Sequence, residues 1–79
     1  MPSLKEIIEF DSKYVADTEV TVDDRFPTVS IGGEDGVFLD GHEAEAFVDE
    51  AKKLYEQVGD VTLDDCYRHL AKPFVDALS

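Results

Sequence analysis

The stretch VSIGGEDGVFLDGHE, residues 29–43, predicts two strands, the connection between them and the start of a helix. Polar and apolar residues alternate in 28–31, residues 37–39 are apolar, and the glycine-rich segment 32–36 between them is typical of a hairpin connection. The segment 40–43, Asp-Gly-His-Glu, has the spacing of a capping box, with Asp in place of the usual Ser or Thr. The stretch holds four acidic residues and no Lys or Arg, so the most sharply turned part of the chain is strongly negative.

The residues before this stretch predict a third strand. Residues 19–23 alternate between polar and apolar side chains, as in a strand with one buried face. Residues 24–27 are typical of a turn that ends in a proline. The three strands then form an antiparallel meander. If its apolar side chains face a core, the outer face carries Glu19, Thr21, Asp23, Thr28, Ser30, Phe38 and Asp40.

A short helix is expected before the sheet. Ser3 and Glu6 have capping-box spacing and predict a helix from about Leu4 to about Phe10. The chain has 79 residues, of which 43% are hydrophobic. This length and composition support one small core and no second domain.

Two further helices are expected after the sheet. Residues 44–58 carry an apolar stripe with helical spacing, which Gly59 ends. Residues 62–65 start another helix, which Pro73 should kink or divide by beginning a new last turn. An amphipathic helix and a half-apolar sheet each need a surface to bury against. The predicted fold is therefore α+β, one domain of residues 1–79 with the two C-terminal helices packed on one face of the sheet.

Composition also limits the cellular location. The single cysteine, Cys66, rules out a disulfide within the chain, and charged residues follow Met1 at once in place of an apolar signal segment. No apolar run approaches the ~20 residues of a membrane span. We expect a cytoplasmic protein that does not associate with membranes.

The charge of the chain is strongly negative and unevenly distributed. Asp and Glu number 19 against 7 Lys and Arg, a net charge of −12. Between Tyr14 and Ala51 there are eleven acidic residues and one basic residue, Arg25, a net charge of −10, which leaves −2 for the two flanks. Phosphate binding needs Lys and Arg, so direct binding to nucleic acid is disfavoured. A partner with a basic surface is favoured.

The chain contains residue types that catalysis or metal binding uses, but it shows no complete set of catalytic residues or metal ligands. Cys66 and His69 are three residues apart on an expected helix and could both bind one zinc ion, but a tetrahedral site needs two more ligands. Cys66 also falls on the predicted apolar face, which favours a buried core thiol. No catalytic triad spacing or phosphate-binding loop is found. We predict a protein that is not an enzyme and has no cofactor and no metal site.

The acidic central region is the candidate binding surface. Carboxylates two residues apart on a strand face lie about 6.8 Å apart, and neighbours on a helix about 5–6 Å, spacings that can match successive phosphates. Like charges this close lower stability, which favours a function for the cluster. Phe38 would add an apolar anchor if it faces outward; the alternative packs it beneath a helix or the N-terminal segment. The predicted partner-binding residues are Glu19, Asp23, Glu34, Asp35, Phe38, Asp40, Glu43, Glu45 and Asp49.

In size, charge and lack of a catalytic motif, the chain resembles small phage-encoded inhibitors of host defence, such as anti-CRISPR proteins and other DNA mimics. The resemblance covers size and composition along the whole chain and no specific motif. It implies a protein that binds the basic, nucleic-acid-binding surface of a host protein or complex and excludes DNA from it without any chemistry.

Two other interpretations stay open. The acidic residues could simply keep the surface solvated. The protein could instead be a structural or regulatory interaction domain whose partner covers an apolar helix face, and exposed apolar area on the last two helices would distinguish this function from an acidic surface. The charge opposes close association of the acidic halves, so we expect a monomer or a weak dimer.

Overall fold

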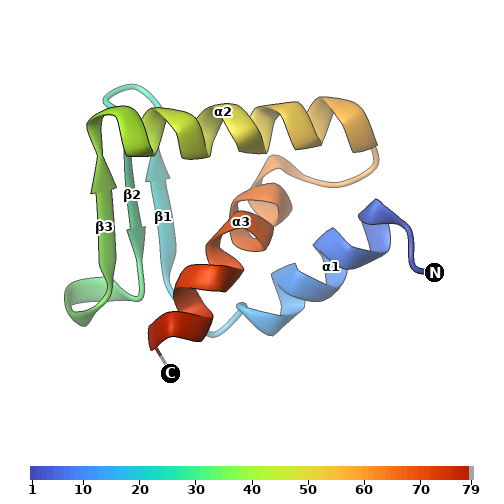
Figure 1. Cartoon of the computed structure of the whole chain (residues 1–79), viewed down its shortest axis with the longest axis horizontal. Coiled ribbons are helices and arrows are strands. Elements are labelled where there is room, and N and C mark those ends of the chain that lie inside the picture. The colour runs from blue at the N-terminus through green and yellow to red at the C-terminus, as the bar shows by residue number, and fades with distance from the viewer. Residues whose placement is uncertain (79) are drawn as a thin grey trace.

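Three antiparallel strands form one sheet, and helices precede and follow it (Figure 1). The computed structural model describes residues 1–78. Its elements are helix α1 (Leu4–Tyr14), strands β1 (Val20–Asp23) and β2 (Thr28–Ile31), the short 3₁₀ helix η1 (Gly33–Asp35), strand β3 (Val37–Asp40), and helices α2 (Gly41–Val58) and α3 (Leu63–Leu78). The predicted α+β fold and its order of elements are confirmed.

The sheet is the meander that the sequence predicts, with strand order β1-β2-β3. Side chains along a strand alternate between the two faces of a sheet. The rows that face the helices are Val20, Ile31 and Val37, and Val22, Val29 and Leu39. The rows on the opposite face are Thr21, Ser30 and Phe38, and Asp23, Thr28 and Asp40. The predicted inward and outward sets are therefore confirmed for all three strands.

The two C-terminal helices pack on the sheet in different places. Helix α2 starts where β3 ends, runs across the strands and contacts β2 and β3, whereas α3 contacts β1 and β2 (Figure 1). Helix α1 lies beside α3, on the side away from the sheet, and α3 is its main neighbour. The result is a flat molecule of 35 × 28 × 15 Å. Within it, α3 lies between α1 and the sheet.

Two clusters of buried apolar side chains hold these elements together. The first contains Val29, Ile31, Leu39, Ala44, Phe47 and Ala71, and the second contains Ile8, Ala51 and Cys66. The predicted burial of the Cys66 thiol is confirmed, and this burial raises the pKa of the thiol. Tyr67 and Leu70 contact both clusters, and the Tyr67 ring stacks on Phe47 with 6.2 Å between the ring centroids. The two clusters therefore meet on α3.

Helix α1 is longer than predicted. The sequence pattern predicts its end near Phe10, where polar residues interrupt the apolar stripe, but the helix continues to Tyr14. The side chains of Asp11 and Ser12 are buried against α3 and have hydrogen-bond partners there. Polar contacts thus extend the packed face of α1 beyond its apolar residues. The predicted cap at the start of the helix is confirmed.

Two other helix boundaries differ from the prediction. Asp40 occupies the N-cap position of α2, but its side chain makes no capping hydrogen bond. Gly41, the first residue of α2, has a φ of 55°, which glycine adopts without a side-chain clash, so the backbone makes this turn. Helix α3 runs through Pro73 to its end, which contradicts the alternative in which a new last turn begins there and leaves the alternative of a kink within one helix. The side chains after the proline pack on the first cluster and hold the last turns in place.

The hairpin glycine Gly36 yields a stability prediction. A Cβ atom at this residue would lie 1.9 Å from the Ile31 carbonyl oxygen and 2.8 Å from backbone atoms of Gly32. We expect Gly36→Ala to lower the free energy of unfolding by about 3 kcal/mol, because the backbone must move to relieve the clash. Gly41→Ala is the control: its Cβ would meet nothing within 4 Å, and only the positive φ costs about 1–2 kcal/mol. Urea unfolding of both variants measures the difference, and equal losses would contradict the prediction.

Candidate functional site

One face of the sheet points away from α2 and α3. We call it the outer sheet face and define it by Thr21, Asp23, Thr28, Ser30, Phe38 and Asp40, with Glu19 at its edge, where Glu19 also lines a pocket with Val75 and Leu78 of α3. The Phe38 side chain is 64% exposed, so the alternative that packs it beneath a helix is wrong. It shares its row with two hydroxyl residues, Ser30 and Thr21. Phe26, in the turn between β1 and β2, is 74% exposed and is an aromatic residue that the sequence analysis did not assign.

The carboxylates of the outer sheet face lie at its two ends. At one end, Asp23 and Asp40 share a row and are two strand spacings apart, roughly 10 Å. At the other end, Glu19 lies beside the hairpin connection, since a Cβ on Gly33 would be 3.4 Å from a Glu19 carboxylate oxygen. The same end exposes the two acidic residues of η1, Glu34 and Asp35. The aromatic ring and the hydroxyl groups lie between these two acidic ends.

The acidic residues of α2 do not form one group. Residues advance by about 100° around a helix, so Glu43 and Glu45 are about 200° apart. Glu45 and Asp49 lie on the side of α2 that carries Lys52, which is 3.9 Å from Asp24 in the turn after β1. Glu43 lies on the other side, where it borders an apolar groove. All nine predicted residues are exposed, but they are distributed over both ends of the sheet and two sides of α2.

Most carboxylates outside the central region have structural partners. On α1, on α3 and in the loop before α3, all acidic residues except Glu9 bind another side chain or a backbone amide. These are Glu6, Asp11, Asp60, Asp64, Asp65 and Asp76. Asp11, Asp65 and Asp76 join α1 to α3, whereas Glu6, Asp60 and Asp64 make exposed contacts.

Most carboxylates of the central region, residues 15–50, have no such partner. The exceptions are Asp23, which accepts hydrogen bonds from two amides of its own turn, Asp24, which pairs with Lys52, and Glu45, which is 3.7 Å from His42. Within residues 1–78, no ion pair or hydrogen bond is made by the carboxylates of Asp17, Glu19, Glu34, Asp35, Asp40, Glu43, Asp49 and Glu50. The unpaired charge is concentrated on the sheet, its hairpin and the first half of α2.

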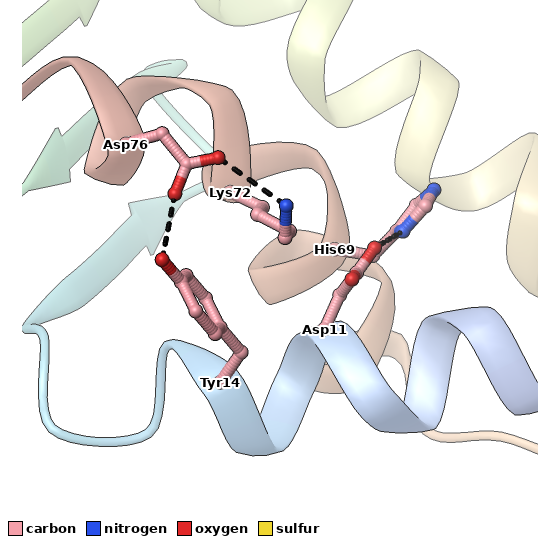
Figure 2. Close-up of polar contacts among 5 residues, drawn as sticks. All are labelled: Asp11, Tyr14, His69, Lys72 and Asp76. Atoms are coloured by element: carbon pink, nitrogen blue, oxygen red, sulfur yellow. Dashed lines mark hydrogen bonds and ion pairs between the residues drawn. The ribbon is translucent and has the colours of Figure 1, made fainter.

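A polar interface between α1 and α3 was not predicted from the sequence. Figure 2 shows the Asp11 carboxylate facing the imidazole of His69, with Oδ2 and Nδ1 2.6 Å apart. These side chains are 11% and 22% exposed. The Ser12 hydroxyl donates to Asp65 at 2.8 Å. The partners are 58 and 53 residues apart in the sequence, so no local pattern signals them.

Further contacts fix the C-terminal end of the same interface. The Tyr14 hydroxyl donates to one oxygen of Asp76 at 3.0 Å, and the Lys72 ammonium donates to the other at 3.2 Å (Figure 2). Lys72 also lies 5.1 Å from the centroid of the Tyr14 ring. The hydrogen bonds from Tyr14 and Lys72 lower the pKa of the Asp76 carboxyl. These contacts join the last turn of α1 to α3.

The interface lacks the arrangement that a nucleophilic enzyme needs. The Cys66 thiol is fully buried and its pKa is raised, which opposes formation of a thiolate. The Ser12 hydroxyl donates to Asp65 rather than to an imidazole. Within residues 1–78, no three side chains of His, Cys, Asp or Glu gather into a set that could hold a metal ion.

An exposed apolar stripe lies on α1. Ile7, Phe10 and Tyr14 follow one another at helical spacing, and Phe10 is 66% exposed. The last two helices expose less, with Tyr55 and Leu78 as their partly exposed large apolar residues. Exposed apolar surface of the kind that the alternative interpretation needs therefore lies on α1 as well as in the apolar groove between α2 and α3.

Comparisons with known proteins identify no relative of this chain. The sequence matches no known protein family, and comparison with curated proteins and with solved structures gave no match. No helix in residues 1–78 is long and apolar enough to cross a membrane. The function has to be inferred from the residues of this chain and their contacts.

The Asp11–His69 pair yields a second stability prediction. We expect His69→Ala to lower the free energy of unfolding by about 1–3 kcal/mol, because the Asp11 carboxylate stays in the interface without its partner. His42→Ala is the matched control, since the His42 ring is fully exposed and should change stability by less than about 0.5 kcal/mol. Urea unfolding at neutral pH measures both. Similar values for the two variants would show that the buried pair contributes nothing.

The Ser12–Asp65 hydrogen bond yields a pH prediction. Burial alone would raise the pKa of Asp65, but hydrogen bonds from Ser12 and Thr62 and the charge of Arg68 outweigh it and hold this pKa below its usual value. The stabilisation is therefore present above the unfolded pKa of about 3.9 and is lost as the pH falls through the lower folded pKa. We expect Ser12→Ala to destabilise the protein most at neutral pH and less at pH 3. Urea unfolding between pH 3 and 7 tests this, and a pH-independent difference would contradict it.

Proposed function

We propose that the protein is a non-enzymatic binding protein whose outer sheet face and neighbouring carboxylates engage a basic surface of a partner and block it. The division of the carboxylates supports this proposal: most of those of α1 and α3 have a partner within the fold, whereas most of those in residues 15–50 have no partner within residues 1–78. Unrelieved like charges lower stability. A basic partner would supply the counter-charges, and the negative field would steer it into contact.

The partner that we propose is a nucleic-acid-binding protein or complex of a host cell. Two acidic ends separated by about the length of a four-residue strand, roughly 10–13 Å, would replace phosphates along its basic surface. Phe38, exposed between these ends, would supply the apolar anchor that interfaces need in addition to charge. Inhibition follows from occupancy alone, because nucleic acid is excluded sterically and electrostatically. This is the action of the anti-CRISPR and DNA-mimic inhibitors that the chain resembles, and it implies a phage-encoded, cytoplasmic protein.

The stripe on α1 favours a second candidate function. Ile7, Phe10 and Tyr14 would let the protein act as an interaction domain that buries this helix against an apolar surface of a partner protein. Such a complex would depend little on salt, whereas binding through the outer sheet face would weaken as salt screens the charges. Substitution of Phe10 by Ser would remove binding in the first case and leave it intact in the second.

A four-amide variant tests the outer sheet face. Glu19→Gln, Glu34→Gln, Asp35→Asn and Asp40→Asn together remove four negative charges and keep side-chain volume. We expect partner binding at low salt to weaken by about fourfold or more, because four exposed ion pairs of roughly 0.2–1 kcal/mol each are lost. The folded state should be as stable as the wild type or more stable, since repulsion is relieved. The measurement is capture of partners from bacterial lysate at low and high salt, followed by titration of the identified partner and competition with double-stranded DNA.

The matched control removes the same charge elsewhere. Glu6→Gln, Glu9→Gln, Glu56→Gln and Asp60→Asn change four exposed acidic residues outside the outer sheet face. This variant should bind nearly as well as the wild type. Equal weakening of both variants would assign the effect to net charge alone. A partner that all three proteins retain in high salt, or that DNA fails to displace, would contradict the proposed function.

A further inference from the structure

A concave surface lies on the opposite side of the sheet from Phe38. It is a groove of about 390 Å³ whose apolar wall consists of Leu39, Phe47, Leu70 and Phe74. Because adjacent residues of a strand point to opposite faces, Leu39 lines the groove while Phe38 stands on the outer sheet face. The groove and the outer sheet face are therefore separate surfaces of one strand.

The groove exists because the two C-terminal helices diverge above β3. Helix α2 contacts β2 and β3, whereas α3 contacts β1 and β2. The helices contact each other through the stacked rings of Phe47 and Tyr67. Above β3 no such contact fills the space, and the apolar wall faces an opening. Concave, apolar surfaces of this kind are the usual binding sites for small ligands and inserted side chains.

Two carboxylates border the apolar wall on the α2 side. Glu43 and Glu50 both line the groove. They are seven residues apart, so they lie on the same side of the helix, about 10.5 Å from each other along its axis. Neither forms an ion pair within residues 1–78. The groove thus combines an apolar wall with two unpaired negative charges at a defined spacing.

The spacing of Glu43 and Glu50 fits a helical partner segment better than an extended one. Cationic side chains seven residues apart on a helix are also about 10.5 Å apart, and they border an apolar stripe made by the residues between them. Side chains on one face of a strand recur at about 6.8 and 13.6 Å, which fits the two carboxylates less well. Recognition of an amphipathic helix by a hydrophobic groove is a recurrent mode of peptide binding.

We propose that this groove binds an amphipathic helix of a partner protein, which inserts large aliphatic side chains between α2 and α3 and pairs two Lys or Arg side chains with Glu43 and Glu50. The inference does not rest on the proposed function, because the groove and the outer sheet face are on opposite sides of the sheet and either can fail alone. Glu43, predicted from the sequence as part of one acidic surface, belongs to the groove.

The experiment uses the full chain and two synthetic peptides. The probe is a capped helical peptide of about 15 residues with leucines along one stripe and two lysines, seven residues apart, beside it; the control peptide has glutamates in place of these lysines. Amide chemical shifts of the ¹⁵N-labelled protein locate the binding site, and titration gives the Kd. We expect the lysine peptide to perturb residues of α2, α3 and β3 around the groove and to bind at least about tenfold more tightly than the glutamate peptide.

Two variants separate groove filling from charge. Ala46 is exposed and lines the groove, so Ala46→Arg should block it without disturbing the core and weaken binding of the lysine peptide at least tenfold. Gln57→Arg adds the same charge on the same helix three turns away, outside the groove, and should leave the Kd within twofold. The double variant Glu43→Gln and Glu50→Gln keeps the shape of the groove and should abolish the preference for lysine over glutamate.

Several results would overturn the proposal. These are no binding of the lysine peptide, equal binding of the two peptides, equal effects of Ala46→Arg and Gln57→Arg, or shift changes centred on the outer sheet face or on the α1 stripe. The four-amide variant of the outer sheet face retains Glu43 and Glu50, so it should bind the lysine peptide as the wild type does. Failure of the groove is therefore distinguishable from failure of the outer sheet face.

Discussion

The packing of α3 against both α1 and the sheet is the contact on which the rest of the structure depends. The two hydrophobic clusters share the side chains of Tyr67 and Leu70, so one helix connects the sheet and α2 on one side with α1 on the other. A chain of 79 residues has too few apolar side chains to form a second, separate core. Helix α3 packs against α1 on one side and against the sheet and α2 on the other. Its polar residues Asp65, His69 and Asp76 all bind side chains of α1. Most carboxylates of the α1–α3 half of the molecule thereby have a partner within the fold.

Within residues 1–78, only two helices pack on the sheet, and they leave parts of it exposed. Two helices can cover one face of a three-stranded sheet, and here they cover it incompletely, so the outer sheet face is exposed and a groove remains above β3. Unpaired carboxylates occupy both of these open surfaces. Solvation alone would account for acidic residues on a surface, but it does not account for the contrast with α1 and α3, where nearly every carboxylate has a partner. That contrast is the physical basis for a partner-binding function on the sheet side.

The sequence predicts those features that local patterns determine. Alternation predicts all three strands and their inward faces, and helical spacing with a following glycine predicts α2 and its end. Features that depend on distant contacts were missed. The end of α1 was placed too early because Asp11 and Ser12 look like surface residues until their partners, more than fifty positions away, are known. Of the two alternatives for Pro73, the new last turn is excluded because the residues after the proline pack on the first cluster, a contact that no local signal contains.

The arrangement of the candidate site was also only partly predictable from local sequence patterns. Every predicted partner-binding residue is exposed, as composition and alternation predicted for the eight acidic ones and left open for Phe38. They do not say which exposed residues lie together, because that depends on the direction in which α2 leaves β3. Gly41, with its positive φ, turns the chain there, and the helix that follows carries Glu43 to one side and Glu45 and Asp49 to the other. A single acidic region of the sequence thus becomes two surfaces of different character: one exposed around Phe38, the other an open apolar groove bordered by charge.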